Sequence, residues 1–163
     1  MKNLIVVDMQ KGQMREENSS LISSINKFLT ENKFDNVFYT RYFNHEESLF
    51  YCALNYKKMT NEDEIEICVD SVEDSFIFPK ETYGLAKEQL AYLKHMGLKE
   101  IYLCGTDIDS CVLAIAFQLF DNGIRPYFIW PLCATKNKDQ SIKETIKPLL
   151  QRNFGKDSII EKL

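Results

Sequence analysis

The sequence is poor in histidine, since His45 and His95 are the only two among its 163 residues. Histidine is the side chain that most often accepts the proton of a nucleophilic cysteine or serine, so its scarcity limits where such a pair can form. His95 lies at the predicted C-terminal end of a helix, where a cation merely complements the helix dipole. His45 lies in a predicted loop, and a cysteine–histidine pair through it is the less favoured interpretation.

Long apolar runs and basic clusters are also absent. No run approaches the roughly 18 residues that a membrane-spanning helix needs, and the first run, Leu4–Val7, is too short for the core of a signal peptide. The formal net charge is −4, and no basic stripe could neutralise a row of phosphates. We therefore expect a soluble, cytoplasmic protein with no nucleic-acid or membrane partner.

The five cysteines include no C-x-x-C pair and are odd in number, which argues against a complete disulfide framework and against a structural zinc site. We expect Cys52, Cys68, Cys104 and Cys133 to be reduced and structural, and we predict no metal and no cofactor. No repeat and no linker rich in glycine and serine divides the chain. With 45% hydrophobic residues, the sequence suits one packed domain over residues 1–163.

Continuous apolar runs alternate with segments of helical spacing along the chain. Helices are predicted over Ser19–Asn32, Tyr83–Met96, Ser110–Asn122 and Lys138–Gln151. Strands are predicted over Leu4–Val7, Asn36–Thr40, Ile65–Val69, Phe76–Phe78, Ile101–Leu103, Tyr127–Trp130 and Ser158–Ile160. The alternation predicts a three-layer α/β/α fold with a doubly wound, mostly parallel, Rossmann-like sheet.

Two segments between these elements are less regular, and one strand end is marked by a proline. Residues 41–58 are aromatic and polar without one clean period, so no element is assigned there. Residues 61–64, Asn-Glu-Asp-Glu, are typical of a solvated turn. Pro79 is expected to end its strand just before Lys80, because proline cannot donate a hydrogen bond within a sheet.

Asp8 and Cys111 lie where a parallel sheet binds its ligands, beyond the carboxyl ends of the strands. Asp8 follows the first strand, and Cys111 follows Ile101–Leu103 at the start of a helix. These two strands are neighbours in the commonest doubly wound order. A thiol at a helix start lies near the positive end of the dipole, which favours the thiolate. We expect both side chains to face one cavity, with Cys111 as the candidate nucleophile.

Lys80 offers an alternative to histidine for activating this thiol. A cation near a thiol lowers its pKa, and a carboxylate such as Asp8 can accept the proton. Lys80 and Asp8 would then together replace the imidazole of a histidine, with Lys80 stabilising the thiolate and Asp8 accepting the proton.

Three segments of the chain carry a resemblance to a known family. They are Leu4-Ile5-Val6-Val7-Asp8-Met9-Gln10, Phe78-Pro79-Lys80-Glu81-Thr82-Tyr83-Gly84 and Cys104-Gly105-Thr106-Asp107-Ile108-Asp109-Ser110-Cys111-Val112. In this order and spacing they resemble the first strand, the lysine segment and the nucleophile segment of the isochorismatase-like cysteine hydrolases. That family includes nicotinamidases, N-carbamoylsarcosine amidases and ureidoacrylate or biuret amidohydrolases.

The resemblance implies that Asp8, Lys80 and Cys111 form a catalytic triad. Cys111 would attack a carbonyl to form a thioester, Asp8 would take its proton and later donate it to the leaving amine, and Lys80 would hold both groups in place. The backbone N–H groups of Asp107 and Cys111 would form the oxyanion hole. The family also has a cis peptide at the position of Thr106–Asp107.

Three positions depart from the family pattern. Nicotinamidases hold a metal through an aspartate and two histidines after the second strand, where this chain reads Thr40-Arg41-Tyr42-Phe43-Asn44-His45. One histidine without the aspartate makes a poor metal site. Gln13 stands where an aromatic residue is common, and Pro131 where an acidic residue often ends a later strand. These departures argue against nicotinamide as the substrate.

The favoured function is hydrolysis of a carbon–nitrogen bond in a small amide or ureido compound. Candidates for substrate contact are Gln13, Tyr42, Phe43, Tyr83 and Trp130. The alternatives are hydrolysis of an isochorismate-like vinyl ether, and a non-catalytic binding or thiol-sensing protein on the same scaffold. A phospho-receiver or a dinucleotide-binding protein is less favoured, because Asp8 lacks an acidic neighbour and Gly105 is not part of a G-x-G-x-x-G loop. The very apolar helix after Cys111 predicts a homo-oligomer, a dimer or tetramer.

Overall fold

The computed structural model describes residues 2–136, 139 and 141–162. Within them, six parallel strands form one sheet in the order β3-β2-β1-β4-β5-β6. The bounds are β1 Asn3–Val7, β2 Asn36–Tyr42, β3 Phe76–Lys80, β4 Glu100–Thr106, β5 Arg125–Ala134 and β6 Ile159–Ile160. The chain builds β1, β2 and β3 outward and then crosses back to place β4 beside β1. The predicted doubly wound sheet is confirmed, and its strand order reverses between β1 and β4.

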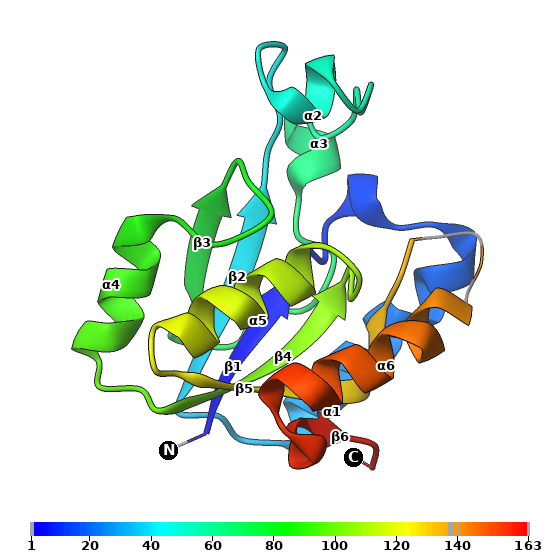
Figure 1. Ribbon diagram of the computed structural model, residues 1–163. Helices are drawn as coiled ribbons and strands as arrows, with labels where there is room; N and C mark the ends of the chain where they lie inside the picture. The colour runs from blue at the N-terminus through cyan, green and yellow to red at the C-terminus, as the bar shows by residue number, and fades with distance from the viewer. Residues whose placement is uncertain (1, 137–138, 140, 163) are drawn as a thin grey trace.

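Helices cover both faces of this sheet, which gives the predicted three layers (Figure 1). Helices α4 (Lys87–His95), α5 (Cys111–Asp121) and α6 (Ser141–Phe154) share one core with one face of the strands. Helix α1 (Ser19–Glu31) covers the other face. Strand β1 contributes alternate residues to the two cores and is fully buried, which explains its continuous apolar run.

Strand β3 contains Pro79 rather than ending before it, so the expected strand end is wrong. Pro79 pairs with Arg41 and Lys80 pairs with Tyr42 in the parallel register of β2 and β3. Since β3 is the edge of the sheet, its outer side needs no backbone donor, and proline is tolerated there. The extra residues carry Lys80 to the carboxyl end of the sheet as a buried side chain.

Two other predictions between β2 and β3 are wrong. Residues 65–69 do not form a strand; they make an isolated antiparallel bridge between Gln10 and Ile67, and the Gln10 side chain donates to the Ile65 carbonyl at 2.9 Å. The expected solvated turn is instead the short helix α3, Glu62–Ile65. Asn61 caps it, because its side chain accepts a hydrogen bond from the backbone N–H of Glu64 at 3.0 Å.

The unassigned segment after β2 contains the short helix α2, Leu49–Cys52. Ser48 caps it by accepting a hydrogen bond from the backbone N–H of Tyr51 at 3.0 Å. In Figure 1, α2 and α3 project beyond the carboxyl end of the sheet. Three single-turn 3-10 helices complete the described structure, η1 Lys11–Gln13, η2 Glu16–Asn18 and η3 Lys156–Ser158.

The longer helices agree with their predicted positions, with shifts at some ends. Helix α4 begins at Lys87 instead of Tyr83, because the carbonyl groups of Thr82 and Tyr83 bind the Lys80 side chain. Helix α6 extends to Phe154, and its predicted start at Lys138 lies outside the described residues. No helix in the described ranges has the length and apolarity to cross a membrane.

Candidate active site

The carboxyl ends of β1 and β3 and the start of α5 bring the three predicted side chains together. Lys80 Nζ lies 2.8 Å from Asp8 Oδ2, with 0% of the Lys80 side chain and 1% of the Asp8 side chain exposed. Cys111 is the first residue of α5, and its thiol lies near enough to the Asp8 carboxylate for that charge to raise the pKa of the thiol. The structure therefore brings an acid, a cation and a thiol together without any histidine.

Thr40 fixes the orientation of Asp8. The backbone N–H of Asp8 donates to Thr40 Oγ1 at 2.9 Å, and the Thr40 hydroxyl donates to Asp8 Oδ1 at 2.6 Å. The Asp8 backbone also has a positive φ of 48°, which turns the chain sharply at the end of β1. One carboxylate oxygen is thus held by the sheet, and the other faces Lys80.

Lys80 is held by three oxygen partners at the base of the site. Its Nζ donates to the carbonyl oxygens of Thr82 at 2.8 Å and Tyr83 at 3.3 Å, in addition to its ion pair with Asp8, and Cys111 lies near enough to affect its pKa. Burial lowers the pKa of Lys80, but the negative charge of Asp8, together with the nearness of Cys111, moves the pKa above its ordinary value. Lys80 therefore stays cationic although it is buried.

The resting state of Cys111 differs from the sequence-based expectation. Burial raises the pKa of its thiol to about 12, and the negative charge of Asp8 adds to this effect. Lys80 lowers the pKa, but by less. These effects favour a neutral thiol at rest, and the nearby Asp8 carboxylate is a group that could accept its proton.

The loop between β4 and α5 is held from both sides. The backbone N–H groups of Ser110 and Val112 donate to the Asp107 carbonyl at 3.1 and 3.0 Å, and Ile108 N–H donates to the carbonyl of Ala134 on β5 at 2.9 Å. The peptide between Thr106 and Asp107 is cis, as the family resemblance implied.

Gly105 allows this loop to begin close to β1. Its φ is +109°, and a Cβ atom at this position would lie 2.2 Å from the carbonyl oxygen of Val7. Val7 and Gly105 are register partners of β1 and β4. Any side chain at residue 105 would therefore collide with the backbone just before Asp8.

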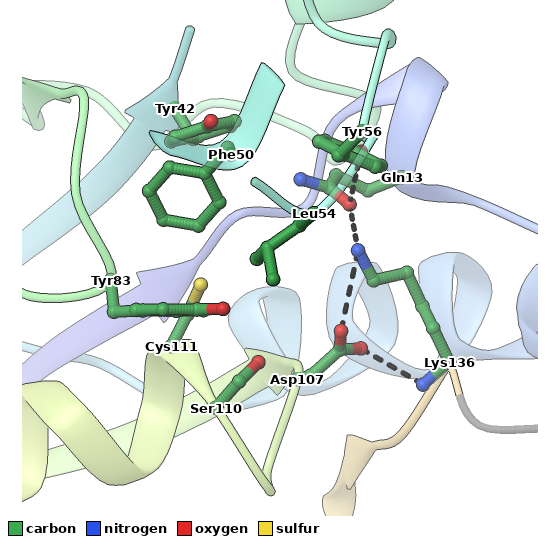
Figure 2. A pocket seen from close by; sticks show the side chains of 10 residues that line it. All are labelled: Gln13, Tyr42, Phe50, Leu54, Tyr56, Tyr83, Asp107, Ser110, Cys111 and Lys136. Carbon is green, nitrogen blue, oxygen red and sulfur yellow. Dashed lines mark hydrogen bonds and ion pairs between the residues drawn. The ribbon is translucent and has the colours of Figure 1, made fainter. Parts of the chain in front are cut away.

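A cavity of about 250 Å³ opens above the thiol. Figure 2 shows the Cys111 sulfur pointing into it beside the Tyr83 ring. Its lining residues are Gln13, Tyr42, Phe50, Leu54, Tyr56, Tyr83, Asp107, Ser110, Cys111 and Lys136. The volume lies below the range of about 300 to 1,000 Å³ found for drug-sized ligands, so the cavity suits a small molecule.

Three of the five candidates for substrate contact, Gln13, Tyr42 and Tyr83, line this cavity, and two do not. Phe43 faces a separate surface hollow on the other side of the segment after β2. Trp130 lies on β5 beneath α6, where its indole N–H donates to Glu144 at 3.3 Å. The structure does not bring either side chain to the thiol.

Sequence reasoning missed several residues that form the cavity. Phe50, Leu54 and Tyr56 come from the irregular segment after β2, whose many aromatic residues were the only available signal. Lys136 follows β5, and nothing in the sequence around it indicates that it lines the cavity. Its Nζ lies 3.2 Å from Asp107 Oδ2 and also donates to Gln13 Oε1 (Figure 2).

The residues at the family's metal position do not suit a metal ion. Asn44 Oδ1 accepts hydrogen bonds from Ser48 Oγ and from the His45 backbone, and Asn44 Nδ2 donates to the carbonyl oxygens of Tyr56 and Lys58. His45 instead lies 3.4 Å from Glu81. Among the described residues, no group of three or more His, Cys, Asp or Glu side chains is arranged to hold a metal.

Comparisons with known proteins give one family and several similar folds. A family model described as the isochorismatase domain matches residues 2–152. A search of curated proteins finds no match. Similar solved structures include the zinc complex of pyrazinamidase from Pyrococcus horikoshii, with a TM-score of 0.83 and 22% identity over 99% of each chain.

Two further structures have the same arrangement. N-carbamoylsarcosine amidase from Thermoplasma acidophilum has a TM-score of 0.74 and 18% identity, covering 95% of this chain and 94% of its own. A cysteine hydrolase from Pseudomonas syringae pv. phaseolicola has a TM-score of 0.82 and 15% identity, covering 94% of this chain and 86% of its own. At these identities the likeness shows the shared fold.

Proposed function

Because the chain belongs to the isochorismatase domain family of hydrolases, we propose that it hydrolyses a carbon–nitrogen bond in a small amide or ureido compound. The reaction would pass through a thioester on Cys111. The observation that carries this proposal is the buried ion pair of Asp8 and Lys80 in contact with the Cys111 thiol at the base of a small cavity.

The contacts suggest how the proton moves. As sulfur attacks the substrate carbonyl, the thiol proton passes to the nearby Asp8 carboxylate, whose position is fixed by Thr40. Lys80 stays charged and stabilises the negative charge that the pair carries. Proton transfer in concert with attack removes the need for a preformed thiolate, which the raised pKa of Cys111 disfavours.

The oxyanion that forms on the carbonyl needs hydrogen-bond donors. We assign this role to the backbone N–H groups of Asp107 and Cys111. Cys111 is the first residue of α5, and the first N–H groups of a helix have no partner within the helix.

Collapse of the tetrahedral intermediate breaks the carbon–nitrogen bond. The protonated Asp8 returns its proton to the nitrogen, so ammonia or an amine leaves and the acyl group stays on sulfur. Water then attacks the thioester with Asp8 as the base, which releases a carboxylic or carbamic acid and restores the thiol.

A vinyl-ether hydrolase and a thiol-sensing protein on this scaffold are the alternatives. The contact between the Cys111 thiol and Asp8 favours amide hydrolysis over both, because it pairs a nucleophile with a base. We further propose that the protein works in the cytoplasm as a homo-oligomer. The exposed rings of Phe117 and Phe120 on α5 support an interface there.

An amide panel with product detection and intact-mass analysis tests the proposal. Wild-type protein should release ammonia and show an added acyl mass, and the Cys111→Ala and Cys111→Ser variants should lose turnover by about 10³-fold or more. The Phe43→Leu variant serves as a control, since Phe43 lies outside the cavity. Turnover that survives in Cys111→Ala would refute a covalent role for this thiol.

A further inference from the structure

The side chain of Gln13 is held in one orientation at the wall of the cavity. Its Oε1 accepts hydrogen bonds from the Tyr56 hydroxyl at 3.2 Å and from Lys136 Nζ (Figure 2). An ammonium group can only donate, so the amide atom that faces Lys136 must be the oxygen. The Gln13 NH₂ group must then point the other way.

The opposite direction leads into the cavity. Figure 2 shows the Gln13 amide nitrogen on the side away from Lys136, and Gln13 is among the lining residues. Within the part of the chain that the structure describes, no protein acceptor binds this nitrogen, and Gln13 as a whole residue is 4% exposed. The nitrogen itself is not cut off from solvent, so a ligand in the cavity can supply its acceptor.

The charges around the cavity cancel in pairs. Lys136 is paired with Asp107, both through Nζ at 3.2 Å and through its backbone N–H at 2.9 Å. Lys80 is paired with Asp8 at the base. Among its described lining residues, the cavity therefore offers no unpaired charge to a charged ligand.

The remaining walls are aromatic and apolar. Phe50 lies between Tyr42 and Tyr83, with ring centroids 5.2 and 4.6 Å apart, and Leu54 lies beside them. Burial raises the pKa of both Tyr42 and Tyr56 far above the ordinary value, so these phenols stay neutral. Such walls favour an uncharged ligand.

We propose that Gln13 is a specificity-determining residue that recognises a hydrogen-bond acceptor at the far end of a small, uncharged amide substrate. Lys136 and Tyr56 act as positioning residues, because they fix the direction of the Gln13 amide. The inference rests on the proposed function for the identity of the substrate as an amide, and its recognition step can be tested without turnover.

Three amides of the same shape and number of non-hydrogen atoms separate the possibilities. 4-Oxopentanamide carries a neutral acceptor at its far end, 4-methylpentanamide carries none, and succinamate carries a charged one. We expect wild-type kcat/KM to be about tenfold higher for 4-oxopentanamide than for 4-methylpentanamide, as one well-placed hydrogen bond provides. Succinamate should be the poorest substrate.

Variants test which side chain recognises the hydrogen-bond acceptor of the substrate. Gln13→Met keeps the size but removes the donor, so the two neutral amides should become equal within about twofold. Lys136→Met should reduce the preference by raising KM for 4-oxopentanamide alone, whereas Lys136→Arg, which still only donates, should restore it. An unchanged preference in Gln13→Met would overturn the proposal.

Binding to the Cys111→Ala variant separates this proposal from the proposed function. Calorimetry should show tighter binding of 4-oxopentanamide than of 4-methylpentanamide in this background, whether or not the wild type turns either over. Binding preference without wild-type turnover would refute amide hydrolysis and support recognition by Gln13. Turnover without a preference between the two neutral amides would refute recognition by Gln13, and so would equal or undetectable binding of these two amides. Stronger binding of succinamate would refute selection for an uncharged substrate.

Discussion

Lys80 Nζ and Asp8 Oδ2 lie 2.8 Å apart in a site from which solvent is excluded. Removing one member would leave the other as an uncompensated buried charge. We therefore expect Lys80→Met to lower the free energy of unfolding by about 3 to 5 kcal/mol. Urea denaturation followed by circular dichroism measures this change.

Two further variants make that experiment specific. The double variant Asp8→Asn with Lys80→Met should be more stable than the sum of the single changes predicts, because neither charge is then left alone. Lys11→Met removes a lysine from exposed pairs with Asp63 and Glu66, so it should change stability far less than Lys80→Met does. Equal effects of Lys11→Met and Lys80→Met would contradict the buried pairing.

The raised pKa of Cys111 predicts an unusual alkylation profile. A thiol with an ordinary pKa of about 8.5 reaches its maximal iodoacetamide rate near pH 9.5. Because burial and Asp8 raise the pKa of Cys111 to about 12, its rate should still rise tenfold per pH unit between pH 7 and 10. Peptide mapping can follow Cys111 against the exposed Cys52 in the same sample.

The Asp8→Asn variant should separate thiol reactivity from catalysis. Removing the carboxylate lowers the pKa of Cys111, so alkylation at pH 8 should become about tenfold faster or more. Turnover should nevertheless fall, since the base that receives the proton is gone. A variant with slower alkylation and normal turnover would rule out Asp8 as the proton acceptor.

Gly105 should be intolerant of even the smallest side chain. Gly105→Ala places a methyl group 2.2 Å from the carbonyl oxygen of Val7 at a φ of +109°, so we expect a loss of about 3 kcal/mol or more in unfolding free energy. Gly123 also has a positive φ, +76°, but nothing lies within 4 Å of its added Cβ. Gly123→Ala should cost about 1 kcal/mol, and a similar cost at residue 105 would argue against the close approach of β1 and β4.

Turnover should not depend on a metal at the position used by nicotinamidases. The Asn44 side chain is occupied by hydrogen bonds to Ser48, Tyr56 and Lys58, and only His45 of the expected ligands is present nearby. Protein treated with EDTA and then desalted should keep its kcat/KM within about twofold, and added zinc should not raise it. Loss of activity with EDTA that zinc restores would show a metal site of another composition.

The reactive part of the site was predictable because it depends on local patterns at strand ends. Asp8 ends a continuous apolar strand, and Cys111 begins an apolar helix, so the rules for parallel sheets place them together. Lys80 needed the family resemblance, because Pro79 suggested that its strand had already ended. Proline is tolerated there only because β3 lies at the sheet edge, which strand order alone reveals.

The selective part of the site could not be predicted in the same way. Phe50, Leu54 and Tyr56 lie in a segment that has only one helical turn, so no periodicity identifies the side that faces the cavity. Lys136 meets Gln13 across 123 positions of sequence, and a contact of that kind depends on tertiary packing. The sequence also favours the thiolate of Cys111 through the helix dipole, whereas burial, which a sequence does not show, raises the pKa of the thiol.

The position of α2 beyond the carboxyl end of the sheet has a consequence for how this scaffold can diversify. Two of the cavity residues, Phe50 and Leu54, lie within or just after this short turn, whereas Asp8, Lys80 and Cys111 are anchored in the sheet and α5. Insertions or exchanges in the turn can therefore alter which molecules enter while the bond-breaking groups keep their geometry. Grafting this turn from a relative is accordingly a route to new substrates with little loss of folding stability.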